Sequence, residues 1–224
     1  MVQIRLFATL LILLGTLHAI SKPHILTFGK WQTVKWIVGF EEDKELELRI
    51  RPLYVDGKLK EFTLGAPHEI TDRLFAVRRV FRVNDTLPGE KNQIPRWTWE
   101  RGNWLLIDRA TARIAQVVLP EFDVFYSNAV WYRDYAAYCG VSADGKKVYA
   151  VVAQVGRRKP VLRQLLKDVK VGELPDSACP APEWQKQPVR VTFESDADQK
   201  LVFAIRTRSL DIVRNSDDES EDAE

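Results

Sequence analysis

Apolar residues alternate with other residues at a period of two along most of this chain, and turn signals interrupt them roughly every 8 to 15 residues. Val, Ile, Tyr, Phe, Trp and Thr, the strand-forming residues, dominate these segments. Helical periodicity is confined to one short candidate, Gln164 to Val169. We therefore predict an all-β chain of about 10 to 12 mostly antiparallel strands, which must curl or split into a sandwich, a barrel or a few-bladed propeller-like fold.

Three segments have the pattern of a β-hairpin. Residues 46–64 alternate around Asp56-Gly57, a pair suited to a tight turn with positive φ. Residues 189–205 alternate around an acidic turn. Residues 135–155 differ from the other two, because both of their strands are apolar or small on both faces, so we expect this hairpin to lie at the centre of the fold.

Two further segments give more detailed expectations. Residues 95–120 are bracketed by prolines and contain turn signals at 101–103 and 109–111, which predicts three strands. Residues 72–85 predict a strand with Leu74 and Ala76 facing inward, Val77 as a further inward candidate, and its arginines on an exposed side.

The two ends of the chain differ from the body. Residues 1–21 carry one positive charge, an apolar run of about 12 residues and then small residues, which is typical of a signal peptide. This run is shorter than the roughly 20 residues of a membrane span, so we expect no stable span after cleavage and a periplasmic or extracellular location. Residues 22–214 are predicted to form a single all-β domain, and residues 215–224 a disordered acidic tail.

The mature chain would contain two cysteines, Cys139 and Cys179. An even count in an exported protein favours a disulfide between them, although two buried free thiols remain the alternative. The bond would tie the strand at 135–141 to the proline-rich loop at 173–188.

Charge is distributed unevenly between the body and the tail. Residues 22–214 hold 32 basic and 25 acidic residues, whereas residues 215–224 hold six acids and no base. A mildly basic body favours anionic partners such as phospholipid headgroups or acidic polysaccharide. The expected partners are an envelope protein or a polysaccharide, and an exported protein meets little nucleic acid.

Aromatic residues supply the candidate binding positions. Trp97 and Trp99 share one strand face, and Trp104 follows across a predicted turn, so the three form a possible sugar-stacking patch or, alternatively, an internal cluster. The second group is Trp131, Tyr132, Arg133 and Asp134, which precede the central strand. This group is either a loop-borne site or a structural Arg-Asp pair that closes the strand with aromatic packing beside it.

The sequence contains few residues arranged in a pattern typical of a catalytic site. After signal cleavage only His24 and His68 remain, and they stand far apart in the sequence, so we predict neither a metal site nor a Ser-His-Asp triad. Glu121, Asp123 and Asp134 could supply a glycosidase-like carboxylate pair, although some such grouping is expected by chance. The sequence has no glycine-rich phosphate loop, and we assign no catalytic residue and no cofactor.

Two strings resemble β-propeller segments. GVSADGKKVYAVV, residues 140–152, is similar to the strand-turn-strand of a blade. LLIDRATARIAQVVLP, residues 105–120, resembles the connection between blades in quinoprotein-like or surface-layer propellers, and the likeness covers about residues 104–163. GRRKPVLR after WYRDYAAYCG, behind a signal peptide, resembles an uncharacterised family of exported bacterial all-β proteins. That resemblance implies no activity.

Three hypotheses follow for function. The first is a non-catalytic, exported all-β module of the cell envelope with a role in protein interaction or assembly. The second is a polysaccharide-binding protein that uses its surface Trp and Tyr residues, and the third is a glycoside-active hydrolase.

Overall fold

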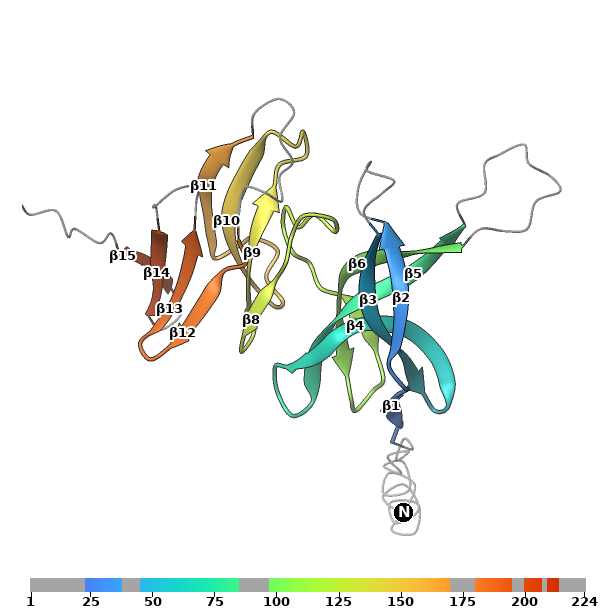
Figure 1. The fold of residues 1–224 in the computed structure, drawn as a ribbon. Coiled ribbons are helices and arrows are strands. Elements are labelled where there is room, and N and C mark those ends of the chain that lie inside the picture. The colour runs from blue at the N-terminus through green and yellow to red at the C-terminus, as the bar shows by residue number, and fades with distance from the viewer. Residues whose placement is uncertain are drawn as a thin grey trace, which may run out of the picture.

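The computed structural model describes most of the chain between residues 23 and 213 (Figure 1). The described ranges are 23–37, 45–84, 97–169, 180–194, 200–206 and 209–213. They contain fifteen β-strands, arranged in three antiparallel sheets.

The N-terminal sheet has seven strands in the order β1-β3-β4-β5-β6-β7, with β2 also paired to β3. These strands are β1 Leu26–Phe28, β2 Gln32–Ile37, β3 Glu45–Val55, β4 Lys58–Glu69, β5 Leu74–Asn84, β6 Trp97–Asp108 and β7 Ile114–Gln116. β3 and β4 form the hairpin predicted around Asp56 and Gly57, whose φ angles are 51° and 73°.

The other two sheets have four strands each, and sequence neighbours are spatial neighbours in both. The middle sheet contains β8 Val130–Tyr132, β9 Tyr135–Val141, β10 Lys147–Gln154 and β11 Leu162–Asp168. The C-terminal sheet contains β12 Glu183–Lys186, β13 Val189–Glu194, β14 Lys200–Arg206 and β15 Ser209–Val213. A four-stranded sheet is also the unit of a β-propeller, and the resemblance to that family stays a prediction.

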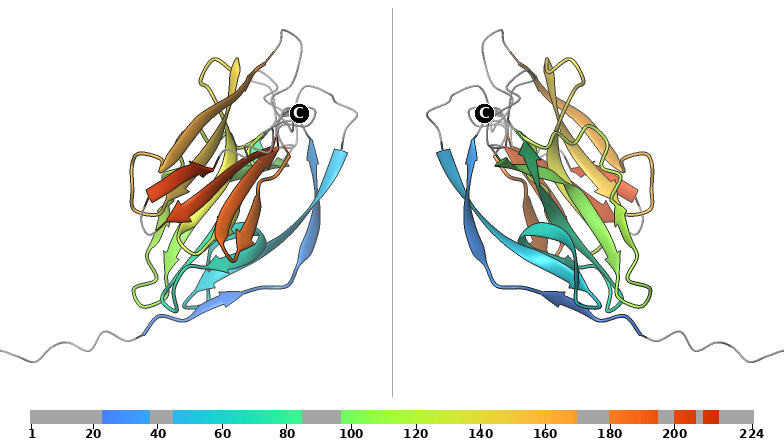
Figure 2. Two further views of the ribbon diagram at one scale, coloured as in Figure 1. Left: turned by 90° about the vertical axis from the view of Figure 1, so that its left-hand side faces the viewer. Right: turned by 90° about the vertical axis from the view of Figure 1, so that its right-hand side faces the viewer.

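The N-terminal sheet curls around its own apolar core without closing into a barrel (Figures 1 and 2). Register shifts in β3, β4 and β5 mark irregularities of the kind that bend a sheet. Two buried clusters fill the interior, one around Leu53 and Phe75 and the other around Ile50 and Val80. β2 approaches β6 across the open side, where the Arg101 guanidinium lies 3.9 Å from the centre of the Trp36 ring.

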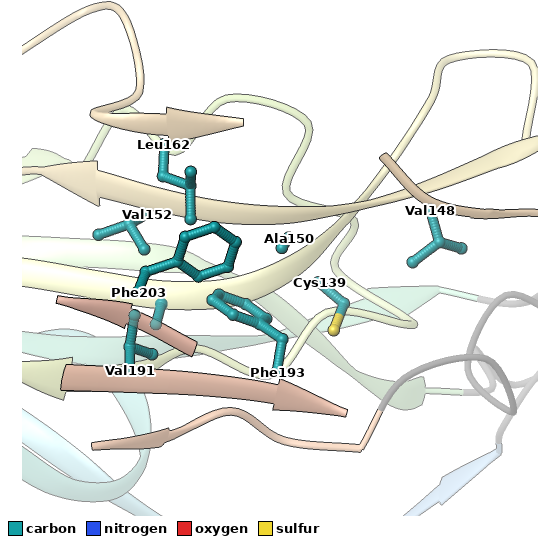
Figure 3. Packing of buried hydrophobic residues seen from close by; sticks show 9 residues of the cluster. Cys139, Val148, Ala150, Val152, Leu162, Val191, Phe193 and Phe203 are labelled. Carbon is teal, nitrogen blue, oxygen red and sulfur yellow. The ribbon is translucent and has the colours of Figure 1, made fainter. Parts of the chain in front are cut away.

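The middle and C-terminal sheets pack face to face as a sandwich (Figure 3). Small residues of β9 and β10 meet larger ones of β13 and β14: Ala137 and Ala150 belong to the same buried cluster as Phe193 and Phe203. The two phenylalanine rings meet edge to face, with centroids 5.9 Å apart. The large rings therefore occupy the space that the alanines leave open.

The β9–β10 hairpin is buried on both faces, as predicted. Its second face holds Tyr138 and Val151 and is covered by residues of the 119–131 segment. Tyr138 donates its hydroxyl to the Pro120 carbonyl at 2.7 Å, and burial raises the pKa of this phenol. The 119–131 segment thus packs against the middle sheet, and its carbonyl groups also accept hydrogen bonds from the N-terminal sheet.

The prediction of an all-β, antiparallel chain is confirmed, with differences in detail. The described residues contain more strands than the 10 to 12 expected, because several strands have only three or four residues. Residues 164–169 are not helical, since β11 pairs with β10 through residue 168. The described part of the segment 95–120 contains two strands instead of three, because residues 101–103 continue β6. Residues 109–111 form the second predicted turn.

The expectation that the arginines of residues 72–85 are exposed is wrong for Arg78, which is 5% exposed. Its guanidinium donates to the carbonyl oxygens of Val124 at 2.8 Å and Gly102 at 3.3 Å. Burial, helped by the nearby positive charge of Arg101, lowers the pKa of Arg78 to about 9. A buried cation of this kind is tolerated because carbonyl groups surround it.

Several predictions concern residues outside the described ranges. These are the signal peptide at 1–21 and the acidic tail at 215–224. The described residues do not show the predicted Cys139–Cys179 disulfide, because Cys179 lies outside them. Within the described ranges, no helix has the length and apolar character that a membrane span requires.

Candidate functional site

Trp131 joins the middle sheet to the N-terminal sheet. Its ring meets Trp104 of β6 edge to face, with centroids 5.2 Å apart, and stacks on His68 of β4 at 5.5 Å. His68 donates from Nε2 to the carbonyl oxygen of Arg133 at 2.7 Å. Trp104 and Trp131 were predicted from the sequence as binding residues, and in the structure they pack against each other.

Tyr132 makes the corresponding contact with the C-terminal sheet. Successive residues of a strand point to opposite faces, so Tyr132 faces away from Trp131. Its ring stacks on Trp184 of β12 with centroids 5.4 Å apart, and Trp184 donates its indole N–H to the Val130 carbonyl at 2.9 Å. The three-residue strand β8 thus connects the three sheets through two consecutive side chains that point to opposite faces.

Arg133 and Asp134 turn the chain from β8 into β9. Arg133 has a φ of 53°, and its guanidinium lies 5.4 Å from the centre of the Tyr132 ring. Asp134 accepts a hydrogen bond from the Gln154 side chain at 2.8 Å, and its carbonyl accepts one from the Val155 N–H. We call Trp104, Trp131, Tyr132 and Trp184 together with His68 the aromatic joint.

Trp97 and Trp99 lie apart from the joint, five and more residues earlier on β6. The Trp97 residue is 53% exposed, while Trp99 packs edge to face on Phe62 with centroids 4.9 Å apart. The Arg82 guanidinium lies 5.8 Å from the Trp97 ring and 5.3 Å from the Trp99 ring. The structure therefore keeps these two tryptophans together and separates them from Trp104.

A second cation–aromatic group lies where β1 and β2 both border β3. Arg49 and Arg51 alternate with the buried Leu48 and Ile50, so they project from the opposite face of β3. Their guanidinium carbons lie 5.4 and 4.5 Å from the centre of the Trp31 ring.

Phe28 extends this stack, because the Arg51 guanidinium carbon is 3.8 Å from the centre of its ring. We name Phe28, Trp31, Arg49 and Arg51 the arginine ladder. Burial lowers the pKa of Arg51, and its Nε atom is buried without a hydrogen-bond partner among the described residues, so only the terminal nitrogens of this guanidinium are open to a partner. Trp31 is 41% exposed, so part of the ladder faces solvent.

The arginines of the ladder differ from four ion-paired arginines in having no acidic partner within the described ranges. Arg73, Arg79, Arg109 and Arg163 each bind a carboxylate, at distances of 2.5 to 2.8 Å. Within the described ranges, Arg49 and Arg51 make no ion pair with a carboxylate, and neither does Arg82. These guanidinium groups contact aromatic rings instead.

The three carboxylates considered for glycoside hydrolysis all have structural partners. Glu121 forms a two-point ion pair with Arg163, with oxygen to nitrogen distances of 2.7 and 2.8 Å. Asp123 accepts the backbone N–H groups of residues 125 and 126, and Asp134 is bound as described above. The described residues also contain no group of three or more His, Cys, Asp or Glu side chains placed to hold a metal ion.

Sequence reasoning missed the ladder and Arg82. The alternation of Arg49 and Arg51 with apolar residues was a usable signal that they share an exposed face. Their contact with Trp31 was not predictable, because it depends on β1 and β2 pairing with the same strand.

Comparison with known proteins adds no relative: no protein-family model, no curated protein and no solved structure matches this chain.

Proposed function

We propose that this protein is a non-catalytic, exported module of the cell envelope that binds an acidic protein partner through its arginine ladder, in an interaction or assembly role. The observation that carries this proposal is the pair of guanidinium groups that stack on Trp31 without an acidic partner in the described ranges. The C-terminal sandwich and the aromatic joint serve as its scaffold.

The ladder is suited to anions because of how it holds its arginines. An aromatic ring contacts the face of a guanidinium, whereas the N–H donors lie in the guanidinium plane and remain available at its edge. Stacking also restricts a long side chain before a partner arrives, so less conformational entropy is lost on binding. Planar carboxylates match this geometry with two parallel hydrogen bonds.

The test uses residues 22–224 and poly-L-glutamate as an acidic probe, with affinity measured at low and high salt. We expect Arg49→Gln to weaken binding about tenfold, the value of one lost charge-assisted contact. Arg157→Gln is the matched control, because Arg157 is an exposed arginine in the turn between β10 and β11. Equal loss in both variants, or no salt-dependent binding, would overturn the proposal.

Polysaccharide binding is the second candidate function, and the exposure of Trp97 beside Arg82 favours it. An exposed indole offers a flat apolar face to a sugar ring, and a guanidinium beside it can bind an acidic substituent. Polygalacturonate is the probe for this candidate. Trp97→Ala should weaken polygalacturonate binding and leave poly-L-glutamate binding unchanged, and the opposite pattern would remove the candidate.

Export and disulfide formation are parts of the proposed function. The signal-like residues 1–21 support export. The Cys139 Sγ atom lies 3.8 Å from the carbonyl oxygen of Pro180, the residue after Cys179, and this proximity supports a Cys139–Cys179 bond. Mass spectrometry of the secreted protein, with and without reductant, tests both points: the mature mass gives the cleavage site, and alkylation counts the free thiols.

A further inference from the structure

The structure leaves open which acidic partner the ladder binds, and the chain itself contains a segment of the matching chemistry. We infer that the ladder of one copy binds residues 215–224 of a second copy, so that the protein assembles head to tail. This inference rests on the proposed function, because it names the partner of the same ladder. Two observations carry it: the charge of the two surfaces and the positions of the strands that present them.

Charge complementarity is the first observation. Residues 215–224 contain six acids and no base, which is the strongest concentration of one charge in the chain. Arg49 and Arg51 make no ion pair within the described ranges, and both guanidinium groups lie over the Trp31 ring. A run of carboxylates can pair with both guanidinium groups in succession. Such a contact is mostly electrostatic, so it weakens as salt screens the charges.

The arrangement of the sheets is the second observation. Residues 215–224 follow β15, which belongs to the C-terminal sheet, whereas the ladder lies on β1, β3 and the β1–β2 connection in the N-terminal sheet. The C-terminal sheet packs on one face of the middle sheet, and the N-terminal sheet meets the 119–131 segment on the other. β15 and β2 accordingly lie at opposite ends of the molecule (Figure 1). This separation favours binding between copies over binding within one copy.

Contact between two different surfaces has a structural consequence. In an open arrangement each added copy leaves one ladder and one acidic segment unoccupied, so the assembly grows by further copies, whereas the same contact gives a closed ring if the rotation between copies closes. An exported open assembly would have a direction, with a free ladder at one end and a free acidic segment at the other.

The experiment measures the mass of residues 22–224 in solution by sedimentation velocity, at about 0.05 M and about 0.5 M NaCl. We expect association that grows with protein concentration at low salt and is lost at high salt. The ladder variant is Arg49→Gln, chosen because Arg49 is more exposed than Arg51. The tail variant changes all six acids to amides: Asp217→Asn, Asp218→Asn, Glu219→Gln, Glu221→Gln, Asp222→Asn and Glu224→Gln.

Each variant alone should be monomeric. The two variants move the net charge in opposite directions, so a general charge effect cannot abolish association in both. An equimolar mixture of the two should form dimers and nothing larger, since only one intact ladder and one intact tail remain. Arg157→Gln together with Arg158→Gln, on an exposed turn, should associate like the unchanged protein.

A protein that is monomeric at low salt, or a tail variant that associates normally, would overturn the inference. Binding to poly-L-glutamate separates this failure from failure of the proposed function. If Arg49→Gln still loses poly-L-glutamate binding, the ladder binds acids but its partner is another molecule. If poly-L-glutamate binding does not depend on Arg49, the proposed function fails together with the inference.

Discussion

Arginine has distinct roles in this molecule, and its neighbours decide which role each residue has. Arg78 is buried among carbonyl groups, and its neighbour Arg79 pairs with Glu61 at the surface at 2.8 Å. Arg49 and Arg51 lie against aromatic rings. β5 supplies two of these roles at consecutive positions, at the register shift between Arg78 and Val80, where regular alternation is interrupted.

Arg78 and Arg79 should differ in how much each contributes to stability. Arg78→Met should lower the free energy of unfolding by about 3 kcal/mol, because the change leaves buried carbonyl oxygens without donors. Arg79→Met should cost less than about 1 kcal/mol, since it removes an exposed ion pair. Urea unfolding of both variants measures the difference. Similar costs would mean that the Arg78 hydrogen bonds do not hold the 119–131 segment against the N-terminal sheet.

At the scale of elements, the sequence predicted what local patterns determine. The β3–β4 turn and the fully buried β9–β10 hairpin follow from Asp56-Gly57 and from two-sided apolar alternation. Register and long-range pairing were not predictable, because they depend on which strands meet. For that reason Trp104 was grouped with Trp97 and Trp99, although the structure places it against Trp131, and no sequence pattern identified Trp31 as the neighbour of two arginines.

Gly140 gives a prediction at the element scale, because β9 and its neighbours pack closely there. A Cβ atom on this residue would lie 2.8 Å from Cγ2 of Val151 and 3.1 Å from Cβ of Glu121. Gly140→Ala should therefore destabilise the protein by about 1 to 3 kcal/mol.

A double-mutant cycle tests the cause of that cost. Val151→Ala removes the closest methyl group, so Gly140→Ala should cost clearly less in the Val151→Ala background than in the unchanged protein. Chemical unfolding of the four proteins gives the coupling free energy. A coupling of zero would show that Val151 is not what excludes the methyl group.

For the whole molecule, cooperativity depends on β8. The N-terminal sheet and the sandwich have separate apolar clusters, and the aromatic joint and the arginines that bind the 119–131 segment connect them. If the connection is strong relative to the difference in stability between the two parts, both unfold in one transition. β8 provides much of that connection from three residues, since Trp131 faces one part and Tyr132 the other.

Trp131→Ala should therefore separate the unfolding of the two parts as well as destabilise the protein. We expect the free energy of unfolding to fall by about 3 to 5 kcal/mol, which is typical of removing a packed tryptophan. Calorimetry should show two thermal transitions in place of one. Trp97→Ala is the matched control, because it removes the same side chain at a site that is 53% exposed and outside the joint. It should cost less than about 1 kcal/mol and keep a single transition. If Trp131→Ala also keeps one transition at a lower temperature, the joint stabilises both parts without coupling them, and the coupling must come from Arg78 and the 119–131 segment.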